Sequence, residues 1–344
     1  MARNESYVIN QAAYLALRAL GTAMQCFEVN DVMATVGAAG DFWFRRDRKR
    51  RERSLDHIRR SLPELDEMQA LDLCRASMRH LLQTFVVEVV FAPRLITPTN
   101  WPKYLRFGRV REALAILTGN RPAIFLSGHC GNFELLGFTL ATVGYPMTAL
   151  ARPLDLPRIN DWLLEVRQRR GMTILTKFGA TQQAASLIER GNRVAFIADQ
   201  NAGDRGLFVP FFGRLASAYK SIGLLAMRYD VPIVCGFARR LRPDVFSYEI
   251  DLADVIEPAH WQAQPDPLYY ITARYTRAIE EMVRRAPEQY FWVHRRWKSR
   301  PSHERAGRPF PESLRRRIAD LPWMADESLA RLIEASERES ALAR

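Results

Sequence analysis

The sequence is poor in cysteine and has no long apolar run. Its 344 residues include four cysteines, which are widely spaced and form no CxxC or Cys/His cluster. The cysteines are Cys26, Cys74, Cys130 and Cys235. This pattern argues against a zinc module and against a disulfide scaffold. It predicts reduced thiols in a protein that faces the cytosol.

No stretch reaches the roughly 18 unbroken apolar residues of a spanning helix, and the mean hydropathy is −0.22. A polytopic membrane protein is therefore excluded. Residues 7–25 are mostly apolar, but Arg18 lies near their middle, where burial in a bilayer would cost about 2.5–3.5 kcal/mol. The segment also lacks the pattern of a secretory signal. We expect a helix that lies in the membrane interface or packs on the domain, and the sequence leaves insertion open.

Acidic residues are fewer than basic ones, 38 against 50, so the net charge is +12. Such an excess predicts an anionic partner: nucleic acid, an acidic protein or lipid headgroups. The densest basic run, residues 45–53, directly follows Phe42, Trp43 and Phe44. This combination favours an anionic membrane surface over a merely solvated helix face. No RNP, helix-turn-helix or zinc-finger pattern supports nucleic-acid binding.

Short apolar runs alternate with helical patterns from residue 108 onward. This alternation predicts an α/β fold with a mainly parallel central sheet flanked by helices, after an N-terminal membrane-associated helical segment. We expect three parts: residues 1–60 with the membrane-associated helix and basic segment, a larger α/β domain over 61–301, and a charged helical tail over 302–344. The expected strands are 123–128, 147–152, 172–176, 193–199, 232–238 and 246–252. The expected helices are 67–90, 108–118, 132–143, 159–169, 179–190, 215–229 and 267–286.

The string LSGHCGNFELLG, residues 126–137, places His129 at the end of the first of these strands, where ligands bind in open α/β sheets. Asn132 is a good N-cap for the following helix. With His129 in the loop before the cap, Glu134 in the first helical turn can accept from one ring nitrogen. That contact would leave the other nitrogen free as a general base.

Other roles for this string stay open. A core or capping role is the default for a histidine and a glutamate five residues apart. Cys130 could act as a nucleophile with His129 as its base. Adjacent residues at a strand end tend to point to opposite sides, so we interpret Cys130 as structural. The spacing is not HExxH, which argues against a metal site.

Two later segments and one short string add candidate substrate-binding residues. Residues 198–221 begin at the end of another strand, which would bring Asp199 and Gln200 near His129, and Phe208 and Phe211 would form an apolar wall or enter the core. Residues 286–301 concentrate cations that suit phosphate, or else form a basic surface turn. A further cation, Arg152, follows the second strand. The candidates of the 286–301 segment are His294, Arg295, Arg296 and Lys298.

In these strings the chain resembles the late acyltransferases of lipid A assembly, the lauroyl- and myristoyl-type enzymes of the glycerolipid and lysophospholipid acyltransferase superfamily. The resemblance covers roughly residues 5–301. His57 stands where an Asn is commoner in that family, and the tail beyond about 302 has no counterpart. The strings that carry the resemblance are SGHCGNFELLG, ARPLDLPRIND, IADQNAGDRGLFVPFFG and APEQYFWVHRRWKSRP.

The resemblance implies direct acyl transfer from an acyl thioester, usually acyl-acyl carrier protein, to a hydroxyl of a lipid A precursor. It assigns His129 as general base and Glu134 as its partner, and ties Arg152 and Asp199 to the active site. It implies no metal or cofactor. It also implies attachment to the cytoplasmic face of the bacterial inner membrane, whose anionic surface would be a partner.

The residues are compatible with that chemistry. A neutral histidine can take the hydroxyl proton, and backbone N–H groups around Asn132–Glu134, or Arg152, can stabilise an oxyanion. Alternatives remain: an acyltransferase for another glycolipid, a lysophospholipid or an aminolipid, a thioester hydrolase, or a non-catalytic docking module for lipid or acyl carrier protein.

Overall fold

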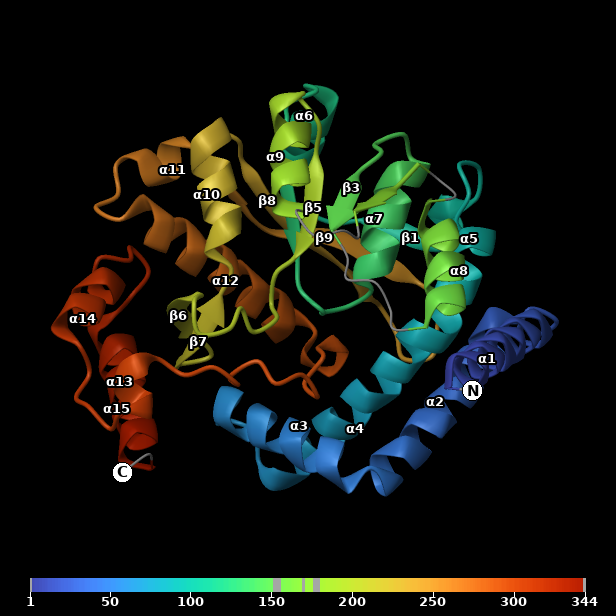
Figure 1. The fold of residues 1–344 in the computed structure, drawn as a ribbon, viewed down its shortest axis with the longest axis horizontal. Coiled ribbons are helices and arrows are strands. Elements are labelled where there is room, and N and C mark those ends of the chain that lie inside the picture. The colour runs from blue at the N-terminus through green and yellow to red at the C-terminus, as the bar shows by residue number, and fades with distance from the viewer. Residues whose placement is uncertain (1, 151–155, 169–170, 176–179, 343–344) are drawn as a thin grey trace.

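A seven-stranded sheet forms the centre of the protein, seen here in a computed structural model that describes residues 2–150, 156–168, 171–175 and 180–342 (Figure 1). The strand order is β1-β9-β8-β2-β5-β3-β4. All neighbours pair in parallel except β8 and β9, so the predicted mainly parallel α/β fold is confirmed. The strands are β1 (Leu105–Phe107), β2 (Ile124–Ser127), β3 (Thr148–Leu150), β4 (Thr173–Leu175), β5 (Val194–Ile197), β8 (Ile233–Arg240) and β9 (Tyr248–Ile256).

Helices cover both faces of the sheet because successive strand residues point to opposite sides. In β2, Ile124 and Leu126 enter the largest apolar cluster, while Phe125 enters a separate cluster on the other face. The second face is covered by α6 (Arg111–Thr118) and α7 (Phe133–Thr142). The first face is covered by α9 (Ala180–Glu189), α10 (Lys220–Tyr229) and α12 (Pro267–Arg285).

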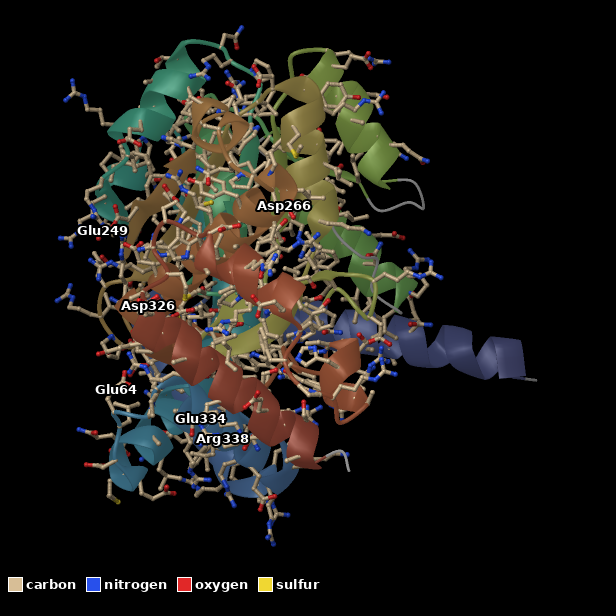
Figure 2. The ribbon with its side chains drawn as sticks, turned by 90° about the vertical axis from the view of Figure 1, so that its left-hand side faces the viewer. Glu64, Glu249, Asp266, Asp326, Glu334 and Arg338 are labelled. Atoms are coloured by element: carbon tan, nitrogen blue, oxygen red, sulfur yellow. The ribbon has the colours of Figure 1, made fainter. Side chains whose placement is uncertain are left out.

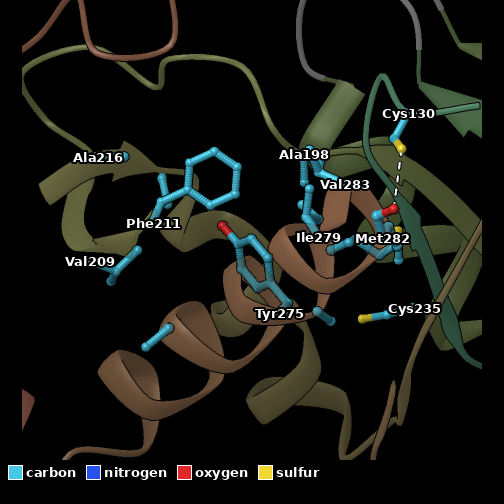
Figure 3. Close-up of a cluster of buried hydrophobic side chains, with 14 of the residues drawn as sticks. Cys130, Ala198, Val209, Phe211, Ala216, Cys235, Tyr275, Ile279, Met282 and Val283 are labelled. Carbon is cyan, nitrogen blue, oxygen red and sulfur yellow. Dashed lines mark hydrogen bonds between the residues drawn. The ribbon is translucent and has the colours of Figure 1, made fainter. Parts of the chain in front are cut away.

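Helix α12 supplies much of the core on the first face. Tyr275, Ile279 and Met282 are at most 1% exposed and lie between the sheet and a neighbouring hairpin (Figure 3). Cys235 of β8 is part of this cluster. Each such side chain, moved out of water, stabilises the fold by about 1.5–3 kcal/mol, so the sheet that carries the strand ends has a rigid support.

The chain before the sheet is helical. Helices α2 and α3 pack on α4, and Asp41 of α2 binds the guanidinium groups of Arg75 and Arg79 of α4 at 2.9 and 2.8 Å. No helix within the described part of the chain is long and apolar enough to cross a membrane. The elements are α1 (Ala2–Met24), α2 (Val29–Arg46), α3 (Arg48–Ser61), α4 (Glu67–Gln83), the π-helical turn η1 (Thr84–Glu88) and α5 (Val89–Leu95).

The C-terminal tail folds back onto the protein. Helix α15, which carries Asp326, Glu334 and Arg338, runs across the face shown in Figure 2 and packs against β7. Ser336 of α15 donates to the buried carboxylate of Glu304 at 2.5 Å. The tail helices are α13 (Ser302–Arg305), α14 (Glu312–Ala319) and α15 (Asp326–Leu342). The predicted boundaries near residues 60 and 301 stay predictions.

The remaining elements link these layers. They are η2 (Trp101–Lys103), α8 (Pro157–Gln168), α11 (Ala259–Gln262) and η3 (Pro287–Gln289).

One predicted segment was wrong. Residues 207–218 form a β-hairpin, β6 (Leu207–Phe211) and β7 (Arg214–Ala218), instead of a loop followed by a helix from residue 215. The two residues of the turn, Phe212 and Gly213, both have positive φ, as a tight hairpin turn requires. Phe212 is held in this unusual conformation by burial and by its backbone N–H, which donates to Glu280 at 2.6 Å.

The turn after β2 requires glycine. Gly131 has φ +64°, and a Cβ there would lie 2.2 Å from the carbonyl oxygen of Ala238. Gly213 has nearly the same φ, +65°, with nothing within 4 Å of its Cβ position. A substitution at Gly213 therefore adds backbone strain alone, whereas one at Gly131 adds the same strain and a steric clash.

We predict that Gly213→Ala lowers the free energy of unfolding by about 1–2 kcal/mol, because only backbone strain is added. Gly131→Ala should lower it by roughly 1–3 kcal/mol more, because the strand carrying Ala238 must move. Urea unfolding of both variants measures the difference. Equal losses would contradict the close approach at Gly131.

Candidate active site

The ends of two neighbouring parallel strands bring the candidate site together. Strands β2 and β5 pair with Ser127 opposite Ile197. His129 follows β2 by two residues and Asp199 follows β5 by two residues, so both leave the sheet at the same edge. The two residues are 70 positions apart in sequence, and the register of the sheet sets the distance between their side chains.

Asp199 binds His129 twice. Its Oδ1 lies 2.6 Å from His129 Nδ1, and its Oδ2 accepts from the backbone N–H of His129 at 3.0 Å. Because an ionised carboxylate only accepts, Nδ1 carries the proton and Nε2 has the free lone pair. The amide nitrogen of Gln200 lies 3.4 Å from Nε2. The structure thus places Asp199 and Gln200 beside His129, with the basic nitrogen turned away from Asp199.

The pair has coupled pKa shifts. Burial acts to lower the pKa of His129, but the attraction of Asp199, its hydrogen bond and the charge of Glu134 outweigh burial, and the pKa is raised. Burial likewise acts to raise the pKa of Asp199, yet the interaction with His129 lowers it to about 2. Asp199 therefore stays ionised at neutral pH, and His129 becomes a stronger base than a free histidine.

Glu134 is not the partner of His129 in the structure, contrary to the prediction. Its Oε2 accepts from Arg167 Nε of α8 at 2.8 Å, and its other oxygen also binds this guanidinium. Within the first turn of α7, the side chain extends toward α8 because a cation is available there. The ion pair is partly buried, at 17% and 18% exposed, and lines the same cavity as His129.

That cavity has a volume of about 490 Å³, within the usual range for ligand pockets. It extends from His129 and Gln200 between the sheet and helices α6 and α7. Its walls are largely apolar, with Glu134, Arg167 and Asp251 as charged exceptions. The apolar lining includes Ala113, Leu117, Phe125, Leu140, Met147 and Met172. Such a shape suits an alkyl chain whose polar end lies at His129.

Two aromatic rings contact His129, and a third packs against both of them. Phe133 and Phe291 lie 4.8 and 5.7 Å from its ring, and Phe85 contacts both of them. Phe85, on η1, is 47% exposed, so it lies where the cavity meets solvent. These rings restrict how far the imidazole can rotate.

Asn132 does not face the cavity, although we predicted it to bind substrate. It is 2% exposed and caps α7, with its Oδ1 accepting from the N–H of Leu135 at 2.8 Å. Its amide nitrogen donates to Glu88 at 2.5 Å. Its backbone N–H donates to Ala238. The first N–H groups of the helix, those of Phe133 and Glu134, have no intrahelical acceptor.

Of the two positions left open for Phe208 and Phe211, a substrate wall or the core, the structure shows the core. Phe211 is 1% exposed and lies in the buried cluster shown in Figure 3. It packs against Phe212 and Trp297. The backbone of Phe208 accepts from the hydroxyl of Tyr269. Neither Phe208 nor Phe211 lines the cavity, because the hairpin packs against α12 on the opposite face of the sheet.

The candidate cations of residues 286–301 differ in how deeply they are buried. Arg296 is 1% exposed and donates to the carbonyl of Ser217 at 2.5 Å, so it cannot reach a phosphate, and its charge instead helps to lower the pKa of Asp199. His294 accepts from the N–H of Asn201, and burial lowers its pKa to about 4, so it is neutral. Only Arg295 and Lys298 are exposed and free to meet an anionic ligand.

Cys130 is buried and its Sγ lies 3.5 Å from the carbonyl of Met282 (Figure 3). Burial raises the pKa of this thiol well above its ordinary value, which makes it a poor nucleophile. Arg152 lies outside the described residues.

Sequence reasoning missed Arg167 and the aromatic ring of Phe85. Arg167 occurs in a helix that we predicted correctly, but nothing local indicates that its guanidinium meets Glu134. The break in helical pattern within residues 84–88 could have signalled a special turn, because π-helical turns are frequent at functional sites.

Comparisons with known proteins agree with the sequence resemblance. A family model described as bacterial lipid A biosynthesis acyltransferase matches residues 6–299. The chain is 27% identical over 204 residues, 59% of its length, to the lipid A biosynthesis lauroyltransferase of Escherichia coli (strain K12), and covers 63% of that protein. It is 27% identical to the lipid A biosynthesis acyltransferase of Haemophilus influenzae, over 49% of this chain and 52% of that protein.

A third relative is the lipid A biosynthesis palmitoleoyltransferase of Escherichia coli (strain K12), 25% identical over 54% of this chain. It is matched over 58% of its own length. The chain thus spans between 52% and 63% of the length of these curated relatives.

We predict that NMR titration of His129 gives a pKa above 6.5, and that Asp199→Asn brings it below 6.5. Removal of the carboxylate charge leaves burial, which disfavours the protonated ring. Glu134→Gln removes one charge as well, but its effect on the pKa should be smaller, since Glu134 acts on His129 only through space. An unchanged pKa in Asp199→Asn would contradict the pairing.

Proposed function

Because the chain belongs to the family of bacterial lipid A biosynthesis acyltransferases, we propose that it transfers a fatty acyl chain from an acyl thioester directly to a hydroxyl of a lipid A precursor. One observation carries the proposal. The free Nε2 of a histidine held by a buried aspartate lies at the polar end of an apolar cavity of about 490 Å³.

The proposed reaction begins with His129. Its Nε2 takes the proton of the acceptor hydroxyl as the oxygen attacks the thioester carbonyl carbon. Asp199 fixes the tautomer and stabilises the imidazolium that forms, as the aspartate of a catalytic triad does. The tetrahedral intermediate then loses the thiolate: the C–S bond breaks, the new C–O ester remains, and the imidazolium returns its proton to sulfur.

The oxyanion of the tetrahedral intermediate must be stabilised by hydrogen-bond donors. The N–H groups of Phe133 and Glu134 point out of the N-terminus of α7, which also carries a partial positive charge. Arg167 is a second candidate, since its guanidinium lines the cavity beside Glu134. We assign the Glu134–Arg167 pair the task of holding this cation and the wall of α8 in place.

The donor is proposed to be acyl-acyl carrier protein. Carrier proteins of this kind are acidic, and lipid A precursors carry phosphates, so both substrates are attracted by the net charge of +12. Arg295 and Lys298 are the exposed cations of the segment that also carries Phe291, which contacts His129. We propose that they meet an anionic group of either substrate.

We further propose that the enzyme works at the cytoplasmic face of the inner membrane. The helices of residues 1–60 would provide the contact, because they present the exposed Phe42, at 59%, together with the exposed Arg45, Arg46 and Lys49. Residues 61–301 would hold the acyltransferase site. Residues 302–344 would form a charged helical tail that packs on this domain.

An acyl-transfer assay tests the proposed function. Purified protein is offered acyl-acyl carrier proteins with a tetra-acylated lipid A precursor, a lysophospholipid or water, and mass spectrometry identifies the products. We expect an acylated lipid A precursor and a loss of about 10²–10⁴-fold in His129→Ala, the usual contribution of a general base. Product with another lipid alone, or thioester hydrolysis alone, would contradict the proposed acceptor. Near-normal turnover in His129→Ala would contradict the proposed base.

If the acyl chain lies in the cavity, the size of the cavity should determine which chain length is preferred. Ala113 lines the cavity from α6, while Ala115 of the same helix is exposed. Ala113→Leu adds three carbons to the wall and should shift the preferred acyl chain to shorter lengths. Ala115→Leu is the matched control and should leave the preference unchanged. Competition between acyl donors of different length measures the shift, and the same preference in both variants would contradict an acyl chain in this cavity.

The basic segment predicts membrane binding. Replacement of Arg45, Arg46 and Lys49 by Gln should weaken binding to phosphatidylglycerol vesicles roughly 10- to 100-fold at low salt, at about 1 kcal/mol or less per charge. The matched control removes three exposed charges from α14, at Arg315, Arg316 and Arg317. Cosedimentation compares the two triple variants. Equal weakening would show that net charge, and not this segment, determines binding.

A further inference from the structure

Beneath the turn that carries His129 lies a buried carboxylate that the proposed reaction does not use. Glu88 is 1% exposed. One of its oxygens accepts from Asn132 Nδ2 at 2.5 Å, and the other accepts from the hydroxyl of Tyr248. Arg240 lies 3.9 Å away and is also buried. A buried charge is costly unless it is paired and hydrogen-bonded. The burial of Glu88 at this position therefore calls for an explanation.

Glu88 determines how the side chain of Asn132 is oriented. An amide can present either its oxygen or its nitrogen, but a carboxylate oxygen accepts only from the nitrogen. Burial raises the pKa of Glu88, while the charge of Arg240 and the hydrogen bonds from Tyr248 and Asn132 favour the carboxylate form. The oxygen of Asn132 is thereby turned toward the N–H of Leu135, which it caps at 2.8 Å. Without the carboxylate, the inverted amide would face this N–H with its own donor, and α7 would lose its cap.

The same network holds the backbone on either side of Asn132. His80 lies 3.4 Å from the carbonyl oxygen of Gly131 and also contacts Arg240. The N–H of Gly131 donates to Gln289, and Gln289 in turn binds the backbone of Arg240 in both directions. The chain from Gly131 to Leu135 is therefore fixed at several points, directly after His129 and around the proposed oxyanion donors.

The π-helical turn η1 explains how Glu88 reaches this position. Its wider backbone aims Glu88 inward at Asn132, while Phe85, three residues earlier, is half exposed and contacts Phe133 and Phe291 beside His129. Turns of this kind are rare and often mark functional sites. Both faces of η1 thus contact the residues that surround the reacting histidine.

We propose that Glu88 is a positioning residue for catalysis: through Asn132 it fixes the start of α7, and with it the oxyanion donors and the loop of His129. The kinetic part of this inference rests on the proposed acyl transfer. The structural part, that Glu88 orders the first turn of α7, stands without it.

A reversed hydrogen bond tests the proposal. Asn132→Asp sets two carboxylates against each other and should lower kcat about 10²-fold with KM nearly unchanged, the size of effect expected from a small misplacement of reacting groups. Adding Glu88→Gln restores the bond with donor and acceptor exchanged, and Asp still caps the helix. The double variant should recover most of the lost kcat. Glu88→Gln alone, which no longer selects one amide orientation, should lose about tenfold.

Two further measurements separate positioning from stability. Glu304 is the matched control: it is 2% exposed and bonded to Arg300 and Ser336 in the tail. Glu304→Gln should lower the melting temperature and leave kcat unchanged. Amide hydrogen exchange at Leu135 should be faster in Asn132→Asp and normal again in the double variant.

The outcomes are distinct. Failure of the double variant to recover both kcat and protection of Leu135 overturns the positioning role. If the wild-type protein transfers no acyl group, the proposed function fails, while exchange at Leu135 still decides whether Glu88 orders this turn. If Glu304→Gln loses as much kcat as Glu88→Gln, the effect is one of general stability and the inference is wrong.

Discussion

The contact between His129 and Asp199 is the interaction on which the site depends. It exists because β2 and β5 pair in parallel and end at one edge of the sheet. The carboxylate lies 2.6 Å from Nδ1, so it selects the tautomer, raises the pKa of the ring and directs Nε2 to the cavity. The proposed oxyanion donors and the proposed acyl chain both lie around that nitrogen.

Two layers of buried polar groups support this contact. On one side, Arg296 binds the carbonyl groups of Ser217 and Gln200 and offers its charge to Asp199. On the other, Glu88 and Arg240 hold the turn after His129 through Asn132 and Gln289. Unpaired, each of these charges would destabilise the fold by several kcal/mol. The hydrogen bonds of these groups hold the residues around His129 in place beside the apolar cavity.

Much of the fold and part of the candidate site could be predicted from the sequence, because apolar runs indicate where strands end. The parallel sheet and the meeting of His129 with Asp199 and Gln200 follow from that pattern. The partner of His129 could not be chosen by sequence distance: Glu134 is five residues away, yet Arg167 binds it, and Asp199 is 70 residues away. Contacts between residues far apart in sequence determine which carboxylate pairs with His129.

The sequence also did not show which of these side chains are buried. Arg295 and Arg296 are neighbours of the same type, but one is exposed and the other is 1% exposed beneath the site. The hairpin of β6 and β7 was missed because Pro210 and a small-residue run disguise its strands. Packing against α12 overrides those local preferences and buries Phe211, for which the sequence left both a substrate wall and a core position open.

We propose that an acyl chain occupies the cavity with its carbonyl carbon at His129. The most direct measurement is a crystal structure with an acyl thioether analogue of the donor. We expect the chain between the sheet and helices α6 and α7, with the carbon that replaces the carbonyl close enough to Nε2 for a hydroxyl to fit between them. An analogue bound on another face, or one whose polar end lies away from His129, would contradict it.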